Sequence, residues 1–90
     1  MGLPRPAPLN PHNMNAARRK ELNKLIGQLE DIKSQIEELQ QEEQDAYDNL
    51  PESLQDGERG ERMQEAAENM EYAATSIDEV IDYINNAIEA

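Results

Sequence analysis

The feature that most constrains this chain is an apolar repeat that begins at Leu22 and stops at Leu50, next to a proline. Its positions are separated alternately by three and four residues, which is typical of a helix that packs lengthwise against another helix. Pro51 lacks a backbone donor and disfavours helix at the residue before it, so it ends the segment. A lone polar member, Glu43, is suited to fixing the register of the packing. The nine positions are Leu22, Leu25, Leu29, Ile32, Ile36, Leu39, Glu43, Ala46 and Leu50.

A second apolar repeat follows, and it is wider than the first. Three columns of apolar residues, each repeating every seven positions, run along it. We predict helices over about 15–50 and 61–89, the second beginning near Glu58–Glu61, with a corner over 51–60. Within the corner, Pro51–Leu54 suits a single helical turn, and Gly57 and Gly60 supply a permissive backbone. The columns are Met63, Met70, Ile77 and Ile84; Ala66, Ala73, Val80 and Ala87; and Ala67, Ala74, Ile81 and Ile88.

Two such repeats joined by a short corner predict an all-α fold, a long antiparallel helical hairpin of the coiled-coil type. A chain of 90 residues is near the limit of independent stability, and no cysteine is present to form a disulfide. The second repeat is also wider than a single neighbouring helix covers. We therefore expect self-association, into a four-helix bundle as a homodimer or into a homotetramer, or else a partner that covers the second repeat. The residues expected at the oligomer interface are Met70, Ala74, Ile77, Ile81, Ile84 and Ile88.

Residues 1–13 differ in composition from the rest, because four of them are prolines. Proline fixes its own backbone angle and biases the preceding residue away from helix, so we expect a disordered tail there. The more ordinary start at Met14 suggests that this tail is either an upstream extension or an artificial remnant. The hairpin domain is therefore predicted over residues 14–90.

Acidic side chains dominate the chain after residue 33. Residues 1–33 carry six basic and three acidic residues, whereas residues 34–90 carry two basic and seventeen acidic ones. Such a body repels nucleic acids and acidic membranes and is attracted to basic surfaces. In the second repeat the acids fall outside the apolar columns, so we expect them on the outer face. With one tyrosine, the candidate residues for binding a basic protein surface are Glu61, Glu65, Glu68, Glu71, Tyr72, Asp78, Glu79 and Asp82.

Two interpretations of this outer face stay open. Closely spaced carboxylates on a helix can imitate the phosphates of a nucleic acid. The same pattern is also typical of a face whose charges only keep a helix in water. The lack of Lys and Arg after Arg62 strengthens the case for imitation, since an ordinary surface helix mixes both signs.

A basic cluster opens the first helix, with Arg18, Arg19, Lys20 and Lys24. Four cations without interleaved aromatic residues are a weak signal for nucleic-acid binding. In an antiparallel hairpin they lie near the acidic C-terminal end, so we expect them to pair with acids of the same chain or of another subunit.

Several classes of function are not supported by any motif. The chain has no nucleophile–base grouping, phosphate-binding loop or dinucleotide glycine pattern, so we expect neither catalysis nor a cofactor. His12 stands alone and the acids before the corner do not follow calcium-loop spacing, so we expect no metal site. No apolar run reaches the roughly 20 residues that cross a bilayer, and no secretion signal is recognisable. We expect a protein partner, with no direct binding to nucleic acid or membrane.

The corner, EEQDAYDNLPESLQDGERGE, carries a resemblance. With the start MNAARRKEL and the final IDEVIDYINNAIEA, it resembles a group of small uncharacterised bacteriophage and prophage helical-hairpin proteins. This resemblance covers residues 14–90 and implies no activity of its own. It implies a setting in the cytoplasm of a bacterial host cell, where small acidic phage proteins often inhibit defence nucleases.

Charge and resemblance together predict a phage-derived inhibitor or modulator. It would compete with nucleic acid for the basic surface of a host defence or nucleic-acid-processing protein, as anti-CRISPR proteins and DNA mimics do. The alternative is a structural homo-oligomer, a coiled-coil adaptor or virion-associated scaffold with no inhibitory role. That alternative draws on the wide apolar repeat, and its acids serve only to keep it in water.

Overall fold

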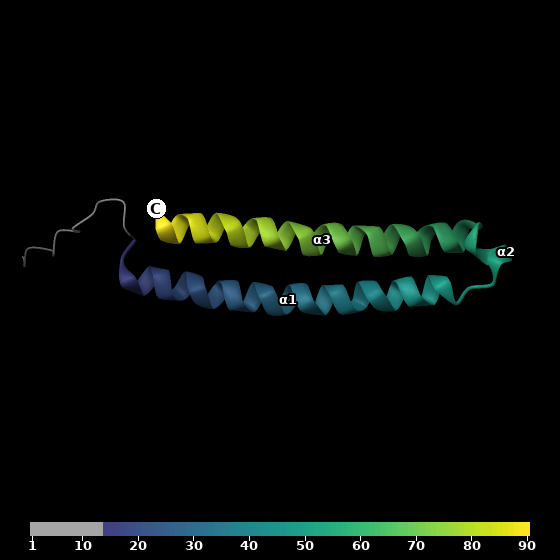
Figure 1. The fold of residues 1–90 in the computed structure, drawn as a ribbon, viewed down its shortest axis with the longest axis horizontal. Coiled ribbons are helices and arrows are strands. Elements are labelled where there is room, and N and C mark those ends of the chain that lie inside the picture. The colour runs from purple at the N-terminus through teal and green to yellow at the C-terminus, as the bar shows by residue number, and fades with distance from the viewer. Residues whose placement is uncertain (1–13) are drawn as a thin grey trace, which may run out of the picture.

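A computed structural model describes residues 14–90, so the tail expected over residues 1–13 lies outside the described residues. Its elements are α1 (Ala16–Asp48), α2 (Glu52–Gln55) and α3 (Glu58–Glu89). The helices α1 and α3 lie side by side and run in opposite directions, and α2 lies at the corner between them (Figure 1). The prediction of an all-α fold with a long helix pair is confirmed.

Local hydrogen bonds account for both ends of α1. The side-chain oxygen Oδ1 of Asn15 accepts a hydrogen bond from the backbone N–H of Arg18 at 2.8 Å, so Asn15 caps the helix. At the other end α1 stops at Asp48, and the Leu50 N–H donates to the Tyr47 carbonyl at 3.0 Å. The helix is therefore slightly shorter than the apolar repeat, as expected for a segment that meets Pro51.

The predicted helical turn after Pro51 is present as α2. The Pro51 carbonyl accepts hydrogen bonds from the N–H groups of Leu54 at 2.8 Å and Gln55 at 3.1 Å. The Gln55 side-chain nitrogen Nε2 donates to the Tyr47 carbonyl at 3.2 Å, which joins the corner to the end of α1. The next helix, α3, begins at Glu58, where acidic side chains suit the positive end of the helix dipole.

The two corner glycines do not have the role expected of them. Neither Gly57 nor Gly60 has a positive φ, so permissive backbone is not what the corner requires. Gly60 is buried, and a Cβ there would overlap the Gln55 carbonyl and lie 2.8 Å from the Gln55 Cα. Gly60 is thus needed for space, because the corner passes directly over it.

The closest packing of the two long helices occurs along one column of α3. Besides Gly60, the buried residues of the described chain are Ala67 and Ala74, at 5% and 4% exposure. They stand seven positions apart, and their small side chains allow the two backbones to approach closely. No large apolar side chain of residues 14–90 is fully buried. A single hairpin therefore has only a thin core.

The prediction of which face of α1 packs against α3 is partly wrong. Leu25, Ile32 and Leu39 were expected in the seam, yet they are 45%, 46% and 54% exposed. A different column of α1, whose members are half-buried, faces α3 in their place. Its members are Ile26, Lys33, Gln40 and Tyr47. The reason is the alanine column of α3, because α1 rotates toward the side where the smallest residues allow the closest contact.

A lysine in this inward column bridges the helices. The Lys33 ammonium Nζ lies 2.9 Å from the Asp78 carboxylate on α3 and 3.9 Å from the Glu37 carboxylate on its own helix. The hydrogen bond to Asp78 raises the pKa of Lys33 above its ordinary value, against a smaller opposing effect of desolvation. This ion pair marks one side of the hairpin as polar.

We expect Gly60→Ala to lower the free energy of unfolding by about 1–3 kcal/mol, because the new methyl group has no space beside Gln55. The matched control is Gly27→Ala. Gly27 lies within α1, and no neighbouring atom comes within 4 Å of the place its alanine methyl group would take, so this change should raise stability by about 0.5–1 kcal/mol. Urea denaturation followed by circular dichroism measures both. Equal stability of the two variants would contradict the packing at the corner.

Candidate functional site

All eight residues proposed for binding a basic surface are exposed on α3. Six of them share a ridge with Thr75, separated alternately by four and three residues, so they lie on one face of the helix. We call this set the acidic ridge. Its members are Glu61, Glu65, Glu68, Tyr72, Thr75, Glu79 and Asp82. The two remaining candidates, Glu71 and Asp78, lie beside the acidic ridge, nearer to α1.

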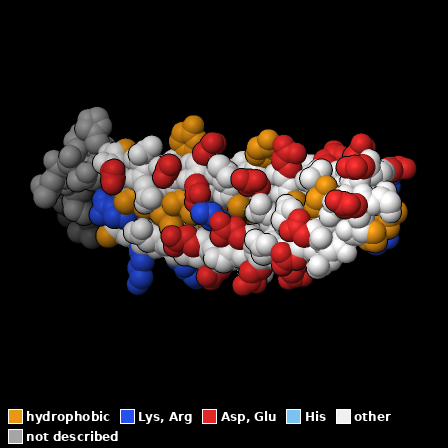
Figure 2. Space-filling model, turned by 45° about the vertical axis from the view of Figure 1, so that its right-hand side comes forward, with side chains coloured by type: hydrophobic (Ala, Val, Ile, Leu, Met, Phe, Trp, Pro, Cys, Tyr) orange, Lys and Arg blue, Asp and Glu red, His pale blue; other side chains and the backbone are white. Residues whose placement is uncertain are grey.

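Few cations neutralise this surface. Within residues 14–90, Asp78 pairs with Lys33, and Glu58 pairs with Arg62 at 2.5 Å. None of the acids on the acidic ridge forms an ion pair in the part of the chain that the structure describes. Acidic side chains are spread along the visible face, whereas basic ones gather mainly toward the end away from the corner (Figure 2). The acidic ridge therefore carries negative charge that the hairpin itself leaves uncompensated.

Tyr72 takes part in the acidic ridge through a hydrogen bond. Its hydroxyl donates to the Glu68 carboxylate oxygen Oε1 at 3.0 Å, although the residue is 60% exposed. This hydrogen bond, with the negative charge of Glu68, raises the pKa of Tyr72 above its ordinary value. The contact keeps an aromatic ring beside the row of carboxylates, where it offers apolar area to a partner.

The residues proposed for the oligomer interface do not lie on an open surface of the hairpin. Ala74 is buried, and the other five are half-buried. In a molecule of two long helices, side chains of α3 lose exposure mainly to α1, so this set faces the interior of the hairpin. Its half-buried members are Met70, Ile77, Ile81, Ile84 and Ile88.

A different group of apolar residues stays open to solvent. Leu25, Ile32 and Leu39 of α1 and Val80 of α3 are each 44% to 54% exposed. The apolar repeat assigned all four to the hairpin seam, so they were missed as surface residues. The signal that could have revealed Val80 is the third apolar column of α3, since a helix pair buries only two of the three, whereas α1 has two apolar columns and gave no such signal.

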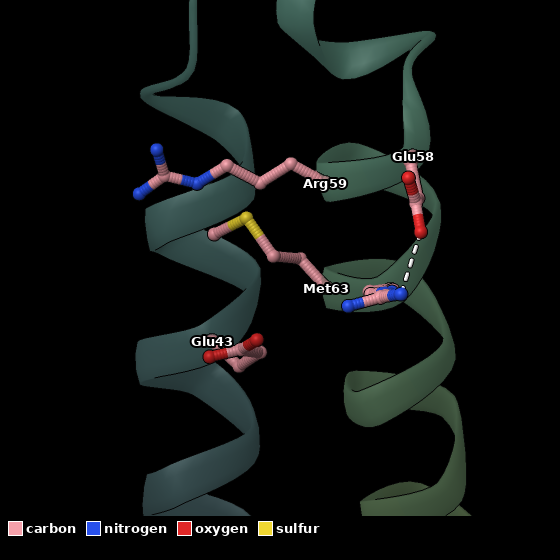
Figure 3. Close-up of a pocket in the computed structure, with 5 residues that line it drawn as sticks. Glu43, Glu58, Arg59 and Met63 are labelled. Carbon is pink, nitrogen blue, oxygen red and sulfur yellow. Dashed lines mark hydrogen bonds and ion pairs between the residues drawn. The ribbon is translucent and has the colours of Figure 1, made fainter.

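A shallow depression near the corner contains the polar seam residue. Glu43 extends from α1, while Arg59 and Met63 reach across from α3 toward it (Figure 3). Glu43 is half-buried and forms no ion pair within residues 14–90, and Arg62 pairs with Glu58. The depression brings together no catalytic pair of acid and base.

Metal-binding and membrane-spanning features are not found in the described residues. Over residues 14–90, no three His, Asp or Glu side chains are arranged to hold a metal ion. None of the helices in the same range has the length and apolar character to cross a membrane.

No protein-family model matches the chain, and no curated protein or solved structure is found to be similar to it. The resemblance of its corner to phage proteins therefore stays a prediction. The acidic ridge and the exposed apolar residues are the two surfaces on which a function can be argued.

We expect Glu68→Gln to lower the pKa of Tyr72, because the carboxylate that opposes ionisation of the phenol is removed. The midpoint for Tyr72 can be followed by NMR of the tyrosine ring carbons, with Tyr72→Phe to assign the signal. Glu65→Gln removes the same charge from the same ridge without removing the Tyr72 hydrogen bond, and it serves as the control. An unchanged midpoint in Glu68→Gln would contradict the contact.

Proposed function

We propose that this protein is a non-enzymatic binding protein that docks its acidic ridge on a basic surface of another protein. The partner is one whose basic surface otherwise holds nucleic acid, and the hairpin blocks that surface by competition. The observation that carries the proposal is the row of exposed acids on α3 with no ion pair among residues 14–90.

The spacing of the acidic ridge supports this function. Side chains three or four positions apart on a helix have Cβ atoms about 5–6 Å apart, which is of the same order as the spacing of phosphates along a nucleic-acid strand. A rigid helix also holds its carboxylates in place before binding, so little ordering is needed when a partner docks. Charge complementarity of this kind mainly speeds association and selects basic partners.

The setting we propose is the cytoplasm of a bacterial host cell, where the partner is a defence or nucleic-acid-processing protein. This part rests on the resemblance of the corner to small phage proteins. A phage-derived inhibitor or modulator combines that resemblance with the charge.

A second candidate is a structural homo-oligomer that acts as an adaptor or scaffold. The exposed Leu25, Ile32, Leu39 and Val80 favour it, since apolar side chains in a row are usually covered in the working assembly. We propose self-association into a four-helix bundle for either function. The two candidates differ in whether the acidic ridge contacts a partner or only water.

We expect the immobilised protein to retain a basic nucleic-acid-binding protein from a bacterial lysate at low salt. Duplex DNA added as a competitor should release it, and raising the salt should lower its affinity at least roughly tenfold. The triple variant Glu65→Lys, Glu68→Lys, Asp82→Lys should lose retention, because it reverses charge along the acidic ridge.

The matched control places the same three charge changes on α1, as Glu30→Lys, Asp31→Lys and Glu38→Lys. Its net charge equals that of the ridge variant, so it should still retain the partner if location matters. Equal retention by the wild type and the ridge variant would overturn the proposed binding face. Retention that duplex DNA does not displace would overturn competition.

A further inference from the structure

The exposed apolar residues of the hairpin are not scattered. Seven large hydrophobic side chains among residues 14–90 are well exposed, and four of them gather on one side, while Leu54, Tyr72 and Tyr83 do not. The four are Leu25, Ile32, Leu39 and Val80.

The helix geometry puts both contributions on the same side. On α1, Ile32 lies one position before the half-buried Lys33 and three positions after the half-buried Leu29. On α3, Val80 lies one position before the half-buried Ile81 and three positions after the half-buried Ile77. Both helices are right-handed and run in opposite directions, so positions in this relation project to the same side of the pair. We call the resulting surface the apolar side. Its members are Leu25, Ile32, Leu39 and Ala46 of α1 and Ala73, Val80 and Ala87 of α3.

The middle of the apolar side is flanked by uncharged residues. The next positions outward, moving away from the buried strip, carry no acid or base along the centre of either helix, although nearly a third of the chain is charged. Depletion of charge is a compositional mark of the centre of protein interfaces. The flanking residues are Gln28, Gln35, Asn69, Ser76 and Tyr83. The Lys33–Asp78 ion pair lies on the opposite side of the hairpin.

We propose that a second copy of this chain docks on the apolar side, apolar side to apolar side, with the two hairpins pointing in opposite directions. The inference rests on the self-association proposed above and assigns its face and its orientation. The pair is a four-helix bundle with twofold symmetry, so both copies use the same set of contact residues.

Charge selects the opposite orientation of the two copies. The half of the hairpin at the corner, residues 34–77, carries thirteen acidic and two basic residues. The open half, residues 14–33 with 78–90, carries seven acidic and five basic ones. Copies pointing the same way would bring two strongly negative halves together. Inverting one copy places each negative half against a nearly balanced one, which lowers the repulsion.

The basic cluster gains partners in this arrangement. Arg18, Lys20 and Lys24 are exposed and form no ion pair within residues 14–90, so the pairing expected for them inside the hairpin is not seen. Arg18 stands seven positions before Leu25 and so continues the apolar side toward the open end. In the inverted pair this end lies over the acidic corner of the second copy, near Glu52.

The area is sufficient for a stable pair. From Leu25 to Ala46 the apolar side is about 32 Å long at 1.5 Å per residue, and two helices make it about 20 Å wide. Two such faces amount to roughly 1,300 Å² in projection, within the range of specific interfaces. The acidic ridge points away from this contact, so the bundle displays one ridge per copy.

The orientation makes a specific geometric prediction. In the inverted pair α1 packs on α1 of the second copy, antiparallel. Aligning the spans from Leu25 to Ala46 places Gln35 beside Gln35 of the second copy and Gln28 beside Glu42 of the second copy. If the copies point the same way, α1 instead packs on α3 of the second copy, and these positions lie far apart.

The first test uses light scattering on the full chain after size-exclusion chromatography. We expect about twice the 10.2 kDa chain mass at low and high salt. The double variant Ile32→Glu, Leu39→Glu should raise the dissociation constant about a hundredfold, because it buries two charges in the contact. The control Asn23→Glu, Ser34→Glu adds the same charge at exposed positions off the apolar side and should leave the mass unchanged.

The second test uses cysteine crosslinking and does not depend on the folding of the glutamate variants. The chain has no cysteine, so single substitutions give unambiguous products. Gln35→Cys should form a covalent dimer on oxidation, and an equal mixture of Gln28→Cys and Glu42→Cys should form a mixed one. Ser34→Cys, which points outward, should not.

Each contrary outcome would overturn a different part of the proposed pairing. A monomer in light scattering overturns self-association together with this inference, while leaving the acidic ridge as a binding surface. A dimer that resists Ile32→Glu, Leu39→Glu overturns the apolar side as the contact. A dimer without crosslinking at Gln35→Cys, but with crosslinking between Gln35→Cys and Ser76→Cys in a mixture, overturns only the inverted orientation.

Discussion

The rest of the structure depends on the close packing of α1 and α3 along the column of Ala67 and Ala74. Both residues are almost fully covered, and their small side chains allow the two backbones to approach closely. A close contact is also narrow. It covers two of the three apolar columns of α3 and one of the two apolar columns of α1, and it leaves the remaining column of each helix in solvent. The thin core and the exposed apolar side therefore both result from this narrow helix contact.

The sequence predicted the elements of this fold better than their rotation. Helix ends follow from local chemistry that is visible in the sequence, such as Asn15 before α1 and Pro51 after it. Rotation about the helix axis depends on which of several similar apolar columns meet. That choice is decided by side-chain size at Ala67 and Ala74 in the presence of the other helix, so Ile32 was placed in the seam and lies outside it.

The candidate site shows the same division. Exposure of the acids on α3 could be predicted, because carboxylates avoid an apolar contact and the period of a helix fixes the face they share. Which individual charges form ion pairs could not be predicted from the sequence. Lys33 was one of several cations that could reach an acid, and only the rotation of α1 puts it within 2.9 Å of Asp78. The same rotation exposes the apolar side, which the apolar columns of the sequence did not identify as a separate surface.

The two surfaces place different demands on the hairpin, and their separation lets one small chain meet both. An apolar contact gains stability from burial and changes little with salt, whereas a ridge of like charges destabilises the fold that carries it and binds by long-range attraction. Repulsion along the acidic ridge must be offset by packing elsewhere, yet within residues 14–90 a single hairpin buries only Gly60, Ala67 and Ala74. In the proposed bundle, a second copy on the apolar side would supply that packing without covering the acids. On the proposed arrangement the charge of α3 and the open column of α1 are linked, because the second apolar contact would offset the repulsion among the carboxylates of the acidic ridge.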